Sequence, residues 1–338
     1  MISNVNDVKR VNTLAILNVL RSVSQATKNM VSQMTGLSVA TCNNLLNELE
    51  AAGKIMACGT MTAPGAGRPA KAYRFNERFA FILCLYVFEE KGEESLSWSV
   101  CDLLGQRIAG GREIAPVDET YILQTVKRLL RENERICGVS FGFPGYYCDQ
   151  QIMTCGIKKL IGCDILKDLE DVSGVSVYIE NDVNAMCAGL CETSPVYEDL
   201  VLLAFYKGRG PGAGLVSGGK VLHGSSSYAG EIQDLVYPEP LDTLLLTHDG
   251  TIRACAAAAV AASVFINPTA ICITGGALGE EDIPAVRELL AASIPQRHIP
   301  ALRYLQDMEE YYFKGLCAKP LYDIRTGGNV HVQTGKHT

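Results

Sequence analysis

The first part of the chain has the hydrophobic spacing of short amphipathic helices. Apolar residues from Val11 to Leu20 recur close to helical spacing, which predicts a helix with one buried face. Residues 26–55 read as two further helices, because the apolar pattern is broken at Thr35-Gly36-Leu37. Ser38 follows this break and suits the N-cap of the second of these helices.

The pattern changes after these helices to that of a strand pair. Residues 54–60 and 70–76 alternate apolar and polar positions as strands do, and a flexible basic tip joins them. Helices across a glycine turn followed by two strands indicate a winged helix-turn-helix, in which the start of the second helix enters the major groove of DNA. The predicted DNA-contacting residues are Ser38, Val39, Thr41, Asn43 and Asn44 on the helix, with Arg68 and Lys71 in the wing. A three-helix protein-interaction module has the same sequence pattern and is the alternative.

The distribution of charge favours DNA as the partner of this head. Residues 1–76 hold eight Lys or Arg residues against three acidic residues, a net charge of +5. Because the whole chain carries −7, residues 77–338 carry −12. A basic N-terminal segment on an acidic chain is typical of proteins that bind a polyanion such as DNA through that segment.

The rest of the chain has the alternation of an α/β protein. From Phe79 onward, apolar strands alternate with helical stretches and glycine turns. The 338 residues suffice for two or three compact units. No apolar run reaches the roughly 18 residues of a membrane span, and the polar N-terminus lacks a signal-peptide pattern, so we expect a cytoplasmic protein with no membrane partner.

Cysteine is frequent but is not spaced as in a metal site. The 13 cysteines are scattered through apolar segments without a C-x2-C pair. We therefore expect mostly reduced core residues, and no metal or cofactor.

The most informative segment is residues 178–189, where an apolar strand runs into Glu180-Asn181-Asp182 and then into a helix. Asp182 has three possible roles: it could cap the helix, hold a ligand hydroxyl, or take a proton from that hydroxyl. Glycine turns lie on other strands. Residues 142–145 permit close approach of the backbone to a ligand, and the loop at 208–214 could bring backbone amides to a phosphate.

The ordered series "GAGRP", "GFPG", "ENDVNA", "GRGPGAGLVSGG", "AGEI" and "INPTAICITGGAL" resembles the ROK family of repressors, open reading frames and kinases. The resemblance covers nearly the whole chain, and the winged head points to the regulator branch. It implies a two-lobed, actin-like body of the sugar-kinase and ribonuclease-H-like type, with a sugar between the lobes, in a homodimer or homotetramer. The expected domains are 1–76 (winged head), 77–185 (first lobe) and 186–338 (a shortened second lobe whose last helix returns to the first).

The resemblance also assigns roles to residues. In the family's kinases, the aspartate matching Asp182 takes the proton of the sugar hydroxyl, while Asn181 and Glu231 match residues that contact the sugar. Together with Gly145, these residues are the predicted ligand site.

Two departures from the family argue against catalysis and against zinc. Tyr86, Val87 and Phe88 occupy the place of the aspartate and glycines that bind phosphate in the kinases, so no catalytic residue is assigned and no kinase activity is expected. Asp234 replaces the histidine that precedes the family's zinc cluster, and no cysteine triplet follows it.

We therefore predict a transcriptional repressor of carbohydrate-related genes that binds double-stranded operator DNA and senses a sugar or sugar phosphate. One alternative is a sugar kinase with an atypical phosphate loop. The other is a ligand-independent DNA-binding regulator with a vestigial cleft.

Overall fold

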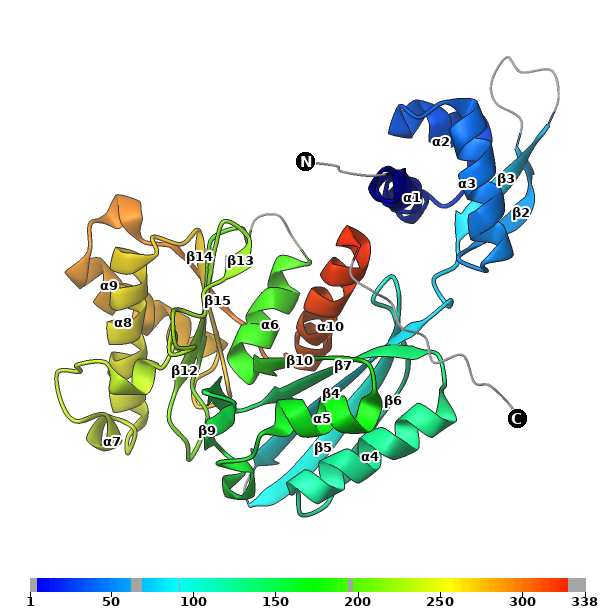
Figure 1. The fold of residues 1–338 in the computed structure, drawn as a ribbon. Coiled ribbons are helices and arrows are strands. Elements are labelled where there is room, and N and C mark those ends of the chain that lie inside the picture. Colours follow the sequence, from blue (N-terminus) through cyan, green and yellow to red (C-terminus); the bar gives the residue numbers. More distant parts are fainter. Residues whose placement is uncertain (1–4, 62–68, 91, 194–196, 328–338) are drawn as a thin grey trace.

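The protein is described here by a computed structural model, which covers residues 5–61, 69–90, 92–193 and 197–327 (Figure 1). The N-terminal head contains three helices and a small antiparallel sheet with the strand order β1-β3-β2. Its elements are α1 (Val5–Ser22), β1 (Ala26–Thr27), α2 (Lys28–Thr35), α3 (Val39–Ala51), β2 (Ile55–Met61) and β3 (Ala70–Phe75). The predicted helices and strand pair are confirmed, and the first helix begins earlier than its apolar pattern suggested.

The turn between α2 and α3 is built as the sequence predicted. Gly36 takes the left-handed conformation (φ 72°) and its N–H donates to the Ser32 carbonyl, which ends α2. The Ser38 side chain accepts a hydrogen bond from the Thr41 amide at 3.1 Å and thereby caps α3. The left-handed Gly36 and the Ser38 cap thus set where α2 ends and where α3 begins.

The first lobe of the body is a five-stranded sheet with the order β10-β7-β4-β5-β6. Strands β4, β5 and β6 form an antiparallel meander, whereas β7 and β10 run parallel to β4. Helices α4 and α5 cover one face (Figure 1). The bounds are β4 (Phe81–Glu90), β5 (Glu93–Asp102), β6 (Arg107–Ile114), α4 (Glu119–Glu132), β7 (Ile136–Phe143), β8 (Gly145–Cys148), β9 (Gln151–Cys155), η1 (Lys158–Leu160), α5 (Ile165–Ser173) and β10 (Ser176–Asn181).

The second lobe repeats this topology in the order β13-β12-β11-β14-β15, again with an antiparallel meander followed by two parallel strands. Helices α8 and α9 cover its outer face (Figure 1). The bounds are β11 (Leu200–Ala204), β12 (Gly212–Ser217), β13 (Lys220–Val221), η3 (Ile232–Asp234), α7 (Leu241–Leu244), α8 (His248–Phe265), β14 (Ala270–Thr274), η4 (Glu280–Asp282), α9 (Ile283–Ser293), η5 (Gln296–His298) and β15 (Ala301–Tyr304).

Two helices, α6 (Asp182–Cys191) and α10 (Glu309–Thr326), fill the space between the sheets (Figure 1). They cross with backbone contact, because a Cβ added to Gly315 would lie 1.7 Å from the Ala185 carbonyl oxygen. Although it is the last helix in the chain, α10 packs against the first-lobe strands β4 and β7. Its C-terminal end also meets the head, where Arg10 Nη1 donates to the Gly327 carbonyl at 3.4 Å.

None of the helices in the described ranges is both long enough and apolar enough to cross a bilayer.

Candidate functional site

The start of α6 is held by Asn181, not by Asp182. The Asn181 side-chain oxygen accepts hydrogen bonds from the amides of Val183 (2.8 Å) and Asn184 (3.0 Å). Its backbone is extended, whereas Asp182 is already the first helical residue. The alternative in which Asp182 caps the helix is therefore wrong, because the cap must precede the first helical turn.

Asn181 also joins α6 to the turn after β7. Its side-chain amide donates to the Gly145 carbonyl at 2.6 Å. Gly145 has a φ of 156°, and a Cβ there would lie 1.8 Å from the Thr154 carbonyl oxygen. The glycine is thus required by the close approach of the two strands β8 and β9, and its carbonyl already has a partner.

Asp182 is a buried carboxylate, with 4% of its surface exposed. One oxygen accepts from the Val183 amide at 2.9 Å, and the other lies 3.5 Å from Arg209 Nη2. Burial raises the pKa of Asp182, and the Arg209 charge and the amide hydrogen bond lower it less than burial raises it. The carboxylate therefore faces one cation at a long distance and keeps capacity to accept from a ligand hydroxyl.

The cation comes from the glycine-rich loop between β11 and β12. The Arg209 guanidinium lies 3.7 Å from the centre of the Tyr206 ring and 4.6 Å from that of Phe88. These cation–π contacts and the Asp182 carboxylate hold the side chain toward α6. The sequence pattern of this loop would also permit backbone amides to bind a phosphate; in the structure the loop presents a guanidinium to a carboxylate.

Aromatic side chains from β4 and α10 lie next to the Asp182–Arg209 pair. Tyr86 stacks on Tyr312 with ring centres 4.3 Å apart. The Tyr312 hydroxyl is buried and has no hydrogen-bond partner among the described residues. Burial raises its pKa, and the Asp182 charge raises it further. Neither Tyr312 nor Arg209 was predicted as a site residue: Tyr312 lies outside the recognised motifs, and the glycine-rich motif that holds Arg209 gave its side chain no role.

Glu231 approaches the same region from the second lobe. Burial raises the pKa of Glu231 most, followed by the charges of Asp182 and Asp234. The preceding Gly230 is fixed on β12, because its carbonyl accepts from the Ala213 amide at 2.8 Å. The structure thus places the four predicted ligand residues, Gly145, Asn181, Asp182 and Glu231, around the junction of the two lobes.

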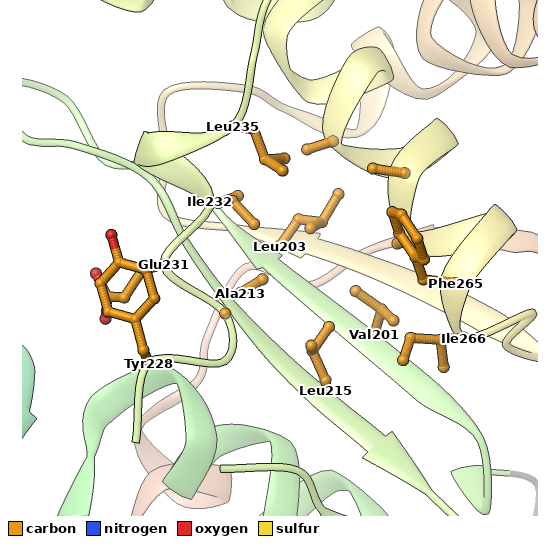
Figure 2. A pocket seen from close by; sticks show the side chains of 14 residues that line it. Val201, Leu203, Ala213, Leu215, Tyr228, Glu231, Ile232, Leu235, Phe265 and Ile266 are labelled. Atoms are coloured by element: carbon orange, nitrogen blue, oxygen red, sulfur yellow. The ribbon is translucent and has the colours of Figure 1, made fainter. Parts of the chain in front are cut away.

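A cavity of about 240 Å³ lies behind Glu231, between the second sheet and α8. Figure 2 shows Glu231 and Tyr228 on one side and the apolar side chains of Leu203, Phe265 and Ile266 on the other. Neither Asn181 nor Asp182 lines it. Its walls are mainly apolar, and of the four predicted ligand residues only Glu231 lines it.

A second polar contact joins the lobes beside this site. His223 Nε2 lies 2.9 Å from Glu180 Oε2, and this hydrogen bond raises the pKa of His223. Asp234, which replaces the family's histidine, accepts a hydrogen bond from the Tyr228 hydroxyl.

The residues after Glu231 do not fit the zinc site that the family implies. The next cysteine in the chain is Cys255, which is buried in α8. Three cysteines do converge in the described part of the chain, but they lie on β4, β5 and α10. Zinc in structural sites takes about four ligands, so a site of the family's type has no ligand set here.

In the head, the predicted DNA-contacting residues differ in their exposure to solvent and in the contacts that they already make. Ser38, Val39 and Asn44 are exposed at the start of α3. Thr41 and Asn43 are half-buried, and the Asn43 oxygen already accepts a hydrogen bond from the Lys28 ammonium.

Of the two predicted wing residues, only Lys71 lies in the described part of the chain. Lys71 forms an ion pair with Glu50 at 2.7 Å, so its charge is partly balanced. Arg68 lies outside the described residues.

Comparison with known proteins identifies both parts of the chain. The profile of winged helix-turn-helix DNA-binding domains matches residues 10–56, and that of the ROK family matches residues 112–236. The chain carries a ROK family domain behind a winged helix-turn-helix. The predicted family and two-lobed fold are confirmed.

Two curated relatives of the ROK domain have different functions. An N-acetyl-D-glucosamine kinase from Yersinia enterocolitica is 30% identical over 170 residues, covering 47% of this chain and 55% of the kinase. A xylose repressor from Staphylococcus xylosus is 23% identical over 231 residues, covering 65% of this chain and 59% of the repressor. The chain therefore spans little more than half the length of either relative.

Solved structures confirm the fold. A ROK family transcriptional regulator, homologous to the E. coli MLC protein, matches with a TM-score of 0.71 and 16% identity over 95% of this chain and all of its own. A ROK hexokinase from Thermus thermophilus matches with a TM-score of 0.56 and 18% identity over its whole length but only 73% of this chain. The winged head makes the architecture regulator-like.

Proposed function

We propose that this protein is a DNA-binding transcriptional regulator, acting as a repressor of carbohydrate-related genes, whose ROK domain senses a sugar or sugar derivative without phosphorylating it. The proposal rests on Arg209, a cation of the protein itself, which lies beside Asp182 in the interlobe site. A winged head with an exposed recognition helix is joined to a body in which Arg209 faces the buried Asp182 carboxylate. With DNA as its partner, the proposed regulator acts in the cytoplasm.

The proposed ligand is defined by the groups around Asp182. The carboxylate accepts hydrogen bonds, the Arg209 guanidinium donates them, and the unpartnered Tyr312 hydroxyl does both. Sugar hydroxyls also donate and accept, so they complement this set. A phosphate or carboxylate on the sugar would compete with Asp182 for Arg209, which extends the ligand class to sugar phosphates.

The proposed response is a population shift. Arg209 belongs to the second lobe, whereas Tyr312 belongs to α10, which packs on the first. A ligand held by both favours one arrangement of the lobes only as far as it binds that arrangement better. Because α10 ends at the Arg10 contact with the head, its movement would shift the recognition helices of a homodimer or homotetramer relative to paired half-sites.

The second candidate is a sugar kinase, which the N-acetyl-D-glucosamine kinase relative and the buried Asp182 favour. Against it stand the aromatic side chains of Tyr86 and Phe88, which fill the region where a kinase of this family needs glycines. We expect no magnesium-dependent ATP turnover across a panel of hexoses and N-acetylhexosamines. Sugar-dependent turnover that Asp182→Asn abolishes would establish the kinase instead.

The test of the regulator is fluorescence anisotropy on DNA from upstream of the protein's own gene, across a salt series and with a panel of sugars and sugar phosphates. We expect salt-sensitive binding that exceeds binding to scrambled DNA and that changes with one ligand class. Asn44→Ala should weaken specific binding about tenfold or more. Asn47→Ala, also exposed on α3, is the matched control and should change it little.

The outcomes separate the two parts of the proposal. Binding no tighter than to scrambled DNA would overturn the regulator. Specific binding that no sugar or sugar phosphate alters would leave a ligand-independent regulator with a vestigial cleft.

A further inference from the structure

Three cysteines from distant parts of the chain meet on one face of the first-lobe sheet. Cys84 lies on β4, Cys101 on β5 and Cys317 on α10. In the β4–β5 ladder, Cys84 pairs with Ser99, and Cys101 is two residues further along the same strand face. Since side chains alternate across a strand, both thiols point toward the face that α10 covers.

The three sulfurs form a compact buried triangle. Cys84 and Cys317 have their Sγ atoms 3.3 Å apart, and all three sulfurs lie within 4.8 Å of one another. The exposed fractions of Cys84, Cys101 and Cys317 are 0%, 2% and 1%. No histidine or carboxylate oxygen of the described ranges joins the group.

We propose that this triangle is a binding site for a soft, thiophilic cation, and that copper(I) is the ion it suits. Thiolate ligands select soft ions such as copper(I) and zinc. Zinc in structural sites takes about four ligands, whereas three sulfurs supply a trigonal set. An ion bonded to three sulfurs at about 2.3 Å holds them about 4 Å apart, so the sulfurs need to move by less than about 1 Å.

Binding releases the thiol protons and forms three copper–sulfur bonds without a change in oxidation state, provided that copper is supplied as copper(I). The Ser99 hydroxyl lies 3.4 Å from the Cys101 sulfur and can donate a hydrogen bond to it once the thiol proton has left.

Of the residues around the triangle, Arg107 reaches solvent, although the three cysteines themselves are buried. Cys101 pairs in the β5–β6 ladder with Arg107, whose side chain is 45% exposed. Arg107 stacks on Phe313 of α10 and therefore lies at the edge of the same interface. The triangle shares β4 and α10 with Tyr86 and Tyr312, but copper(I) titration requires neither DNA nor a sugar, so its outcome does not depend on the proposed function.

The test is titration of the reduced full-length protein with copper(I) under anaerobic conditions, in competition with bicinchoninate. We expect one equivalent to be taken from the chelator, with an affinity that falls at least 100-fold in Cys101→Ala and in Cys317→Ala. Cys255→Ala is the matched control, because Cys255 is equally buried but lies in the second lobe. It should bind copper(I) as the wild-type protein does.

Measurements on the wild-type protein keep the proposal testable if a variant fails to fold. X-ray absorption at the copper edge should report three sulfur ligands. Alkylation after mild denaturation should show copper(I) protecting Cys84, Cys101 and Cys317 together. Failure to compete with the chelator, copper bound at other cysteines, or tighter retention of zinc than of copper(I) would overturn the assignment.

Discussion

The two lobes have the same strand order, but the first turn of each meander is built in opposite ways. In the first lobe, β4 and β5 remain paired from Phe81 and Asp102 to Glu90 and Glu93, so the hairpin closes tightly. In the second lobe, β11 ends at Ala204 and β12 begins at Gly212, which leaves a loop at residues 205–211. One topological position therefore carries a closed hairpin in one lobe and an open loop in the other.

This difference explains how the interlobe site is formed. Tyr86 and Phe88, on the closed hairpin, contribute rings that contact Tyr312 and Tyr206. The open loop of the other lobe has room to turn Arg209 inward to Asp182. The second-lobe loop thus supplies the cation that faces Asp182, whereas the first-lobe hairpin supplies aromatic rings.

The largest expected effect comes from disrupting the contact between α6 and α10, the two helices that lie between the sheets of the two lobes. Gly315→Ala should destabilise the protein by about 3 kcal/mol, because its Cβ would lie 1.7 Å from the Ala185 carbonyl and would force α6 and α10 apart. The gain in helix propensity of about 1 kcal/mol offsets part of this cost. Urea unfolding measures the change in the free energy of unfolding.

Lys319→Ala, exposed on the same helix, should cost about 0.5 kcal/mol or less. If Gly315→Ala changes the stability no more than this control does, the close crossing of α6 and α10 is wrong. Two separate unfolding transitions in the variant would show that the lobes are joined mainly by these two helices.

The next largest effect should come from the open loop. Arg209→Ala should destabilise the protein at neutral pH by about 1–2 kcal/mol, because it leaves the buried Asp182 carboxylate without its cation. Removing this charge should also raise the pKa of Asp182 further. Lys207→Ala, exposed in the same loop, is the control. Equal stability of the two variants would mean that Arg209 does not act on Asp182.

Much of this arrangement could be predicted from local sequence patterns. The winged head follows from helical spacing, the glycine turn before Ser38 and strand alternation, since each depends on neighbouring residues. Motifs likewise located the elbow at Asn181 and Asp182. Even so, only Asp182 was considered as the helix cap, whereas Asn181 caps α6, because the N-cap position depends on where the strand stops being extended.

The rest of the site could not be predicted, because it depends on contacts between residues far apart in the chain. Arg209 and Asp182 are 27 residues apart, and Tyr312 comes from the last helix. Nothing in the sequence near Arg209 shows that its side chain turns inward, since a glycine-rich loop permits many conformations. The convergence of Cys84, Cys101 and Cys317 was missed for the same reason.

A smaller and opposite effect is expected at the carboxylate itself. Because burial raises the pKa of Asp182 in the folded state, folding takes up a proton, and stability decreases as pH rises from the unfolded pKa through the folded pKa. Asp182→Asn removes this penalty. At neutral pH it should leave the stability unchanged or increase it, by at most about 1.4 kcal/mol for each unit by which the pKa is raised.

Thermal unfolding of both proteins between pH 4 and pH 8 measures this effect. The variant should show a flatter pH dependence and a weaker response of DNA binding to the effector. A marked loss of stability in Asp182→Asn would instead mean that the Arg209 ion pair outweighs the cost of burial.

The smallest expected effect concerns the second contact between the lobes. His223 is half-exposed and its hydrogen bond to Glu180 raises its pKa, so the stabilisation is fully present below the unfolded pKa of about 6.5 and is lost as pH rises through the folded pKa. Solvent screening limits the contribution to about 0.5 kcal/mol. His223→Gln should therefore lower the melting temperature slightly at pH 6 and leave it unchanged at pH 8.5.

The matched control is His298→Gln, which removes an exposed histidine from η5. A pH-independent change in His223→Gln would mean that the imidazole contributes through packing, because only an ion pair with Glu180 depends on its protonation. Arg209 would then be the principal charged link between the lobes. Its substitution should alter the effector response far more than that of His223, since only Arg209 contacts the carboxylate proposed to bind the ligand.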